Sequence, residues 1–139
     1  MKVTNMNRVV WVYVLMFIVV IAAFDSARAD DVPDVNPMSG DENAIKGGKS
    51  WFRGVCALCH GGRADGAGER GKGADLRKFN KGFKMYVTTV KNGRTVPGQT
   101  MAMPAWNGVL KDEVIYQIGA YLETLAIEGA NWKEGTKNN

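Results

Sequence analysis

The residues best suited to chemistry in this 139-residue chain occupy one short segment, Cys56-Ala57-Leu58-Cys59-His60. The segment contains both cysteines and the only histidine of the sequence. Two thiols at this spacing can add to two vinyl groups of one porphyrin, and the imidazole that follows can bind its iron. The pattern therefore predicts one covalently attached haem c, held through Cys56 and Cys59, with His60 as an axial iron ligand.

Other uses of a Cys-x-x-Cys pair agree less well with the sequence. A thioredoxin-type dithiol is expected within a βαβ pattern, which does not occur around this segment. A tetrahedral zinc site needs four ligands, and the chain has no further Cys or His to supply them. A disulfide of an exported domain is the alternative that stays open.

A second axial ligand must come from elsewhere, and methionine is the natural candidate because its thioether favours ferrous iron. Met38 falls in a segment without apolar periodicity, and Met85 falls inside a predicted helix, where we expect it to pack. Met101 and Met103 fall in an irregular loop, and Pro104 holds the residue before it extended. We therefore predict Met103 as the ligand and keep Met101 as the alternative, because the two project to opposite sides of an extended segment.

The first 29 residues predict an export signal. They combine a positively charged start, an apolar run over 9–24 and a small-x-small triplet that ends at Ala29, after which we expect cleavage. An uncleaved anchor is the alternative, although a bilayer span needs about 20 apolar residues and this run has 16. We expect a periplasmic protein without stable membrane insertion after cleavage.

After the leader, apolar periodicity and capping residues predict helices joined by loops, and no strand. Residues 30–40, with two prolines, predict a flexible N-terminal arm. Glycine-rich residues 61–82 predict a long loop anchored by Leu76 and Phe79. Three helices are predicted: one from the N-cap Asp41 into the haem-binding segment, one from Phe83 to a C-cap at Asn92-Gly93, and one over 112–125.

Charge is distributed unevenly along the chain. Without Lys2, Arg8, Arg28 and Asp25 of the leader, the 18 basic and 14 acidic residues fall to 15 and 13. Residues 53–94 contain ten Lys or Arg against three acids, whereas residues 30–42 contain five acids and no base. An exported protein meets no nucleic acid, so the basic stretch predicts either an ordinary solvated surface or a rim that attracts an acidic redox partner.

The chain resembles the class I cytochromes c over roughly residues 41–125. The resemblance is carried by Gly48 and Phe52, the segment 56–61, Met103-Pro104-Ala105-Trp106 and Tyr121-Leu122. It implies a small all-α domain over 41–127, followed by a tail over 128–139. It also implies that the N- and C-terminal helices cross, with Gly48 at the crossing and in contact with Tyr121, while long loops wrap around one covalent haem.

Two features depart from that family. It usually has a proline soon after the haem motif, whose carbonyl accepts a hydrogen bond from the proximal imidazole, and here no proline occurs between His60 and Pro97. We expect Gly73 or Ala74 to supply that carbonyl. Lys111 also stands where the last helix often has a Ser or Thr N-cap.

The resemblance implies a monomeric single-electron carrier and not an enzyme. The charged loop and the tail segment 128–132 are similar to periplasmic cytochromes that accept electrons from PQQ-dependent methanol or ethanol dehydrogenases. They imply such a dehydrogenase as electron donor and another cytochrome or an oxidase as acceptor. The alternative is a haem c protein with a labile sixth ligand that binds gases or acts as a catalytic subunit, and thiol–disulfide exchange is a more remote one.

Overall fold

The computed structural model describes residues 32–70, 73–98 and 101–132. The chain divides into two units, residues 1–31 and residues 32–139, and the description concerns the second unit alone. The predicted export signal over 1–29 and its cleavage site therefore lie outside the described residues. Among the residues that are described, no helix has the length and apolar character needed to cross a membrane.

Helix α2, Glu42–Trp51, begins at the residue that the sequence predicts as its N-cap. The Asp41 side chain accepts a hydrogen bond from the backbone N–H of Ala44 at 2.7 Å, and Glu42 lies in the first turn, where the helix dipole favours an acid. The buried face of α2 contains Ala44 and Gly48. The start of the first predicted helix is thus confirmed.

The chain then leaves the α-helical register just before the cysteine pair. A π-helical segment, η1, spans Phe52–Cys56 and continues directly into the short helix α3, Ala57–His60. The wider turn keeps Phe52 fully buried while Trp51 is 43% exposed, although periodicity places both on the packed face. The helix predicted from Asp41 into the haem-binding segment is thus present, and its π-turn was not predicted because no local residue pattern marks one.

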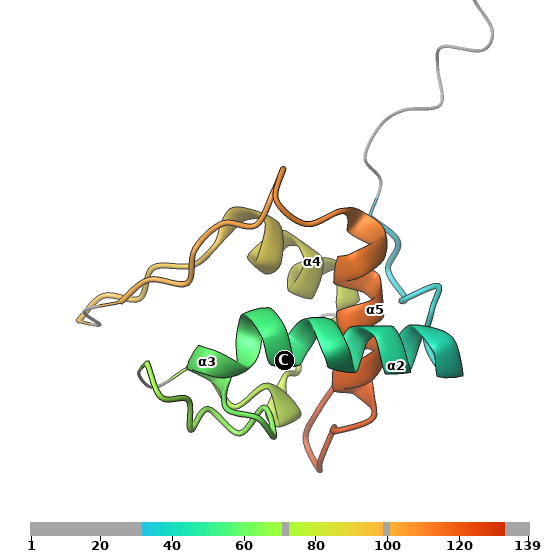
Figure 1. Ribbon diagram of the computed structural model, residues 1–139, viewed down its shortest axis with the longest axis horizontal. Helices are drawn as coiled ribbons and strands as arrows, with labels where there is room; N and C mark the ends of the chain where they lie inside the picture. The colour runs from blue at the N-terminus through green and yellow to red at the C-terminus, as the bar shows by residue number, and fades with distance from the viewer. Residues whose placement is uncertain (1–31, 71–72, 99–100, 133–139) are drawn as a thin grey trace, which may run out of the picture. The chain divides into compact units, whose positions relative to one another are not determined.

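Helix α5, Asp112–Glu123, crosses α2 as Figure 1 shows, so the predicted all-α fold with crossing helices is confirmed. A side chain at Gly48 would overlap the backbone carbonyl of Gln117, and the next nearest backbone atom belongs to Ile118. Tyr121 lies one turn further on, with its ring 5.6 Å from that of Phe52. The closest approach to Gly48 is thus made by Gln117 and Ile118 rather than by Tyr121.

Helix α4, Phe83–Asn92, lies across from α2 and packs against α5. Its buried face consists of Phe83, Tyr86, Val87 and Val90. Met85 is 47% exposed, so the packing role expected for it was wrong: it lies on the opposite face of the helix.

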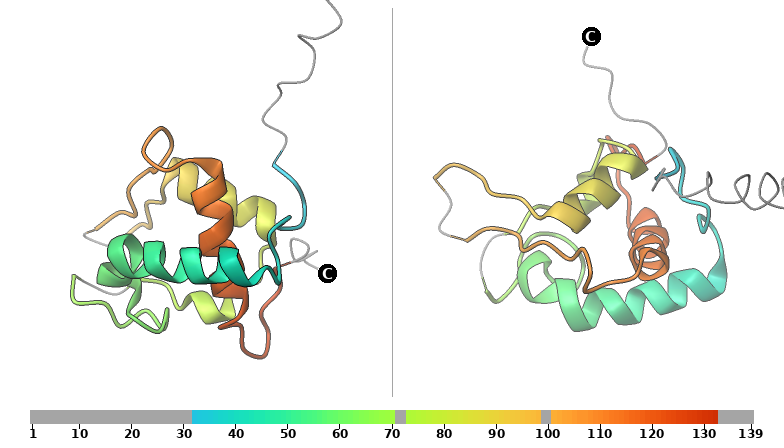
Figure 2. Two further views of the ribbon diagram at one scale, coloured as in Figure 1. Left: turned by 45° about the vertical axis from the view of Figure 1, so that its right-hand side comes forward. Right: turned by 90° about the horizontal axis from the view of Figure 1, so that it is seen from above.

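The remaining chain forms long loops with a few fixed points. Residues 61–70 and 73–75 lie beneath α3, and the second of these segments leads into a 3₁₀ turn, η2, Leu76–Lys78. Residues 93–98 and 101–106 are two antiparallel segments that form a projecting arm, visible in Figures 1 and 2. Within the described part of this arm, an isolated β-bridge joins Arg94 to Met103.

Both flanking segments are tied to the helical core. Asn36 is 3% exposed and donates from Nδ2 to the backbone carbonyl of Tyr116 at 3.0 Å, which ties the N-terminal segment to α5 at this residue. In the tail, Trp132 is buried with its ring 5.0 Å from Phe79 and 5.2 Å from Tyr86, which confirms it as the contact expected there.

Candidate functional site

The predicted iron ligands converge on one cleft of the helical unit. Cys56, His60 and Met103 line it, although they come from η1, from the end of α3 and from the projecting arm. The cleft holds about 540 Å³ of empty space, part of it open to solvent. Its lining is almost wholly apolar, with Phe52 and Leu122 among the side chains that form it. Such a cleft suits a large, flat, apolar ligand fixed by a few polar or ligating groups.

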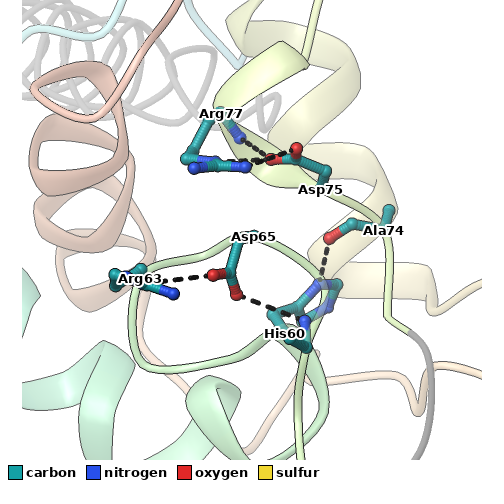
Figure 3. A network of polar contacts seen from close by, with 7 residues as sticks. His60, Arg63, Asp65, Ala74, Asp75 and Arg77 are labelled. Carbon is teal, nitrogen blue, oxygen red and sulfur yellow. Dashed lines mark hydrogen bonds and ion pairs between the residues drawn. The ribbon is translucent and has the colours of Figure 1, made fainter.

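The imidazole of His60 is oriented by the backbone of the following loop. Its Nδ1 lies 3.0 Å from the carbonyl oxygen of Ala74, as Figure 3 shows. Because a carbonyl only accepts, the proton belongs on Nδ1, and the lone pair of Nε2 is left to bind a metal. Of the two carbonyls expected to take this role, Ala74 rather than Gly73 does so, and no proline is needed.

The glycine-rich loop also caps the helix that carries His60. Backbone N–H groups of Arg70, Gly73 and Gly66 donate to the carbonyls of Leu58, Cys59 and His60 at 3.0, 3.1 and 2.8 Å. These are carbonyls of the last turn of α3, which have no partner within the helix. The loop and the haem-binding segment therefore form one hydrogen-bonded unit.

Gly73 makes this close approach possible. A Cβ atom added there would lie 2.6 Å from the carbonyl oxygen of Cys59 and 2.9 Å from Nδ1 of His60. Both distances are shorter than van der Waals contact allows, so any larger residue would displace the loop or the imidazole. The position of Ala74, the hydrogen-bond acceptor, depends on this packing.

Two carboxylates of the same loop are fixed by local hydrogen bonds (Figure 3). Asp65 pairs with Arg63 at 3.2 Å and accepts from the N–H of Ala67, and Asp75 pairs with Arg77 at 2.9 Å. The bond from Ala67 lowers the pKa of Asp65 below its ordinary 3.8, and the bond from Arg77 does the same for the pKa of Asp75. Both carboxylates stay ionised and hold the loop at neutral pH.

The cysteines do not have the properties of a poised redox dithiol. Both are free and half-buried. Burial, and secondarily the neighbouring Cys59, raises the pKa of the Cys56 thiol to about 11, so this thiol is protonated at neutral pH. Redox-active cysteines have a lowered pKa instead. Among the described residues, no group of three or more Cys, His, Asp or Glu is placed to hold a metal ion.

The methionines differ in their positions. Met103 is half-buried in the cleft, whereas Met101 is 53% exposed and Met85 lies on the outer face of α4. Met38 lies in the N-terminal segment, where its N–H donates to Asn36. Met103 is thus the methionine that the fold places with His60 in the cleft.

Helix α4 provides a wall of the cleft that the residue pattern did not predict. Tyr86 and Thr89 line it, and the Tyr86 hydroxyl donates to the carbonyl oxygen of Ile115 at 3.0 Å. Burial raises the pKa of this hydroxyl well above its usual value. Helical periodicity marked Tyr86 as a buried residue, but only the fold shows that it faces the cleft.

A small all-helical unit with a Cys-x-x-Cys-His segment at the edge of an apolar cleft has the fold and the site of a c-type cytochrome domain. The chain belongs to the family of cytochrome c oxidase, cbb3-type, subunit III, which matches residues 43–122. The family implies a covalently bound haem c and an electron-carrying role.

The chain is also similar to the cbb3-type cytochrome c oxidase subunit CcoP of Azospirillum sp. (strain B510), at 33% identity over 104 residues. That alignment covers 69% of this chain and 33% of the relative, so the chain spans about a third of that protein's length. No solved structure matches the chain.

Proposed function

We propose that this protein is a periplasmic single-electron carrier with one haem c, attached through Cys56 and Cys59 and ligated by His60 and Met103. The observation that carries the proposal is the convergence of Cys56, His60 and Met103 on one apolar cleft. The donor set fits the group: two thiols, an imidazole with its Nδ1 proton engaged, and a thioether from a separate segment. Bound there, haem supplies one-electron exchange at its iron.

The chain's own residues have separate roles in this function. His60 and Met103 would both hold the iron and so leave no open site for a substrate, which supports a carrier and argues against an enzyme. Ala74 holds the Nδ1 proton of His60 and fixes the ring. The apolar walls exclude water, and exclusion of water favours the ferrous state because the ferric site carries more charge.

The comparisons favour an oxidase as the electron acceptor, since the relative named above is a subunit of a cbb3-type cytochrome c oxidase. We propose a PQQ-dependent alcohol (methanol) dehydrogenase as the electron donor. It is supported by the likeness of the tail and by the excess of basic residues over 53–94.

The exposed charges of this surface are of the sign that would attract an acidic partner. Within the described part of residues 53–94, five exposed basic residues make no ion pair: Arg53, Arg70, Lys78, Lys81 and Arg94. Docking driven by such charges is transient and weakens as salt screens them.

A redox titration of the purified holoprotein, followed at the α-band, tests the carrier function. We expect a reversible transition with one electron per haem, and no change of the ferrous spectrum under CO. Rapid CO binding would instead support the alternative, a protein with a labile sixth ligand.

The partner is tested by anaerobic reduction with a purified quinoprotein alcohol dehydrogenase and by oxidation with a cbb3-type oxidase. We expect both rates to fall steeply between about 10 and 200 mM salt, as the Debye length shortens from about 30 Å to below 8 Å. A rate that does not depend on ionic strength would contradict docking through the basic surface.

A further inference from the structure

The backbone that carries Met103 is fixed by the segment that runs opposite it in the arm. Arg94 and Met103 exchange two backbone hydrogen bonds: the N–H of Arg94 donates to Met103 at 3.0 Å, and the N–H of Met103 donates to Arg94 at 2.8 Å. The bridge uses only main-chain atoms, so it sets the backbone of residue 103 whatever side chain occupies position 94. It fixes the point from which the Met103 thioether extends into the cleft.

Gly93 brings the two segments closer than any other residue would allow. It follows α4 with φ +72°, and a Cβ atom built on it would lie 2.5 Å from the carbonyl oxygen of Met103. The same Cβ would lie 2.9 Å from the carbonyl carbon of Pro104 and 2.8 Å from the nitrogen of Ala105. All three are backbone atoms, so no side-chain rotation relieves the overlap.

The end of α4 holds the continuation of the same segment. The carbonyl of Val90 accepts from the N–H of Trp106 at 3.0 Å, and that of Lys91 accepts from the N–H of Asn107 at 3.1 Å. These are carbonyls of the last helical turn, which need partners outside the helix. Hydrogen bonds therefore hold the chain on both sides of Pro104. Met103 is bonded to Arg94 before it, and Trp106 and Asn107 are bonded to the last turn of α4 after it.

We propose that Gly93, together with the Arg94–Met103 backbone bridge, is the positioning device that keeps the Met103 thioether at the iron and so keeps the sixth coordination site closed. The inference rests on the proposed ligation by Met103. A ligand on a fixed backbone competes with external ligands at a high effective concentration, and this advantage falls when the backbone moves. Gly93 is thus a positioning residue, since it acts through Met103.

The test compares Gly93→Ala with Gly98→Ala in the ferric holoprotein. Gly98 lies in the same arm with φ +83°, but a Cβ there meets nothing within 4 Å, so this control carries the same backbone strain without the overlap. The readouts are the near-infrared methionine-to-iron charge-transfer band and the affinity for imidazole. We expect G93A to weaken the band and to raise imidazole affinity at least tenfold, and G98A to stay within twofold of wild type.

A second measurement needs no variant. Amide hydrogen exchange on the wild-type ferric protein should show the Arg94 and Met103 N–H groups protected, and both should lose protection together when imidazole saturates the iron. If these two amides exchange as fast as exposed amides in the free ferric protein, the proposal is overturned even if G93A does not fold.

The outcomes separate this inference from the function on which it rests. A wild-type protein with the charge-transfer band, and a G93A variant indistinguishable from G98A, overturns the positioning role and leaves the electron carrier intact. A wild-type protein without the band overturns methionine ligation and the positioning role together.

Discussion

At the scale of single residues, the site depends on how the loop after His60 fixes the imidazole. The Ala74 carbonyl is 3.0 Å from Nδ1, and Gly73 packs against the same nitrogen. The loop thus provides through glycine packing what a proline provides in the class I cytochromes that the chain resembles. Two predictions follow from residues of this loop.

Gly73→Ala should lower the free energy of unfolding of the holoprotein by about 1–3 kcal/mol, because the added methyl overlaps Cys59 and His60. It should also raise the reduction potential, since a displaced Ala74 carbonyl polarises the imidazole less. Urea unfolding and a redox titration measure the two effects. Gly62→Ala is the matched control, because a Cβ at Gly62 meets nothing within 4 Å. Equal behaviour of the two variants would contradict the packing role of Gly73.

The lowered pKa of Asp75 predicts a loss of stability in acid. Its folded-state pKa lies below its ordinary 3.8 because Arg77 stabilises the ionised form. The contribution is therefore present above about pH 4 and disappears as the pH falls through the folded-state pKa. Asp75→Asn should flatten the decline of stability below pH 4, measured by urea unfolding at several pH values. A decline as steep in D75N as in wild type would contradict this contribution of Asp75.

Of the four predicted site residues, Cys56, His60 and Met103 line the cleft and Cys59 does not. How Met103 is held there was not predicted. Cys56, His60 and Met103 were predicted from a five-residue motif and a Met-Pro pair. The sequence did not indicate the positioning role of Gly93, because an Asn-Gly pair after a helix is already explained as the C-cap of that helix. Only the three-dimensional path of the arm shows that Met103, Pro104 and Ala105 pass over that glycine.

At the scale of elements, the crossing of α2 and α5 holds the helical unit together. Gly48 lets the two backbones meet at Gln117, and Phe52 and Tyr121 pack beside the crossing. The helices were predicted from their periodicity and caps. The π-helical segment was not predicted, because it depends on the register that packing imposes. The hydrogen bond from Asn36 to Tyr116 was not predicted either, because no residue pattern marks a single buried asparagine.

Gly48→Ala should destabilise the protein by about 1–3 kcal/mol, because its methyl group would meet the main chain of α5 and force the helices apart. Gly47→Ala is the matched control in the same helix. Its Cβ would lie 3.0 Å from the flexible side-chain amide of Gln117, which can move, and alanine gains up to about 1 kcal/mol of helix propensity. Thermal unfolding of the two holoproteins should show the first destabilised and the second unchanged or stabilised. If G47A were the more destabilised variant, Gly48 would not be the position at which α2 and α5 make their close contact.

At the largest scale, the described residues of the helical unit form an apolar cleft and a projecting arm, and they expose several unpaired basic side chains. The chain belongs to the cbb3-type subunit III family, and the cleft has the donors that a haem c needs. The proposed function depends above all on the identity of the second iron ligand. A bound methionine gives an electron carrier with a closed sixth coordination site, and its absence leaves a reactive haem with an open one.

The near-infrared charge-transfer band of the ferric holoprotein tests this claim most directly when wild type is compared with Met103→Leu and Met101→Leu. Leucine conserves the volume of methionine but removes the thioether, so packing changes little while ligation is lost. The account predicts the band in wild type and in M101L, and its absence, with CO binding to the ferrous form, in M103L. A band that persists in M103L, or is missing from wild type, would contradict it.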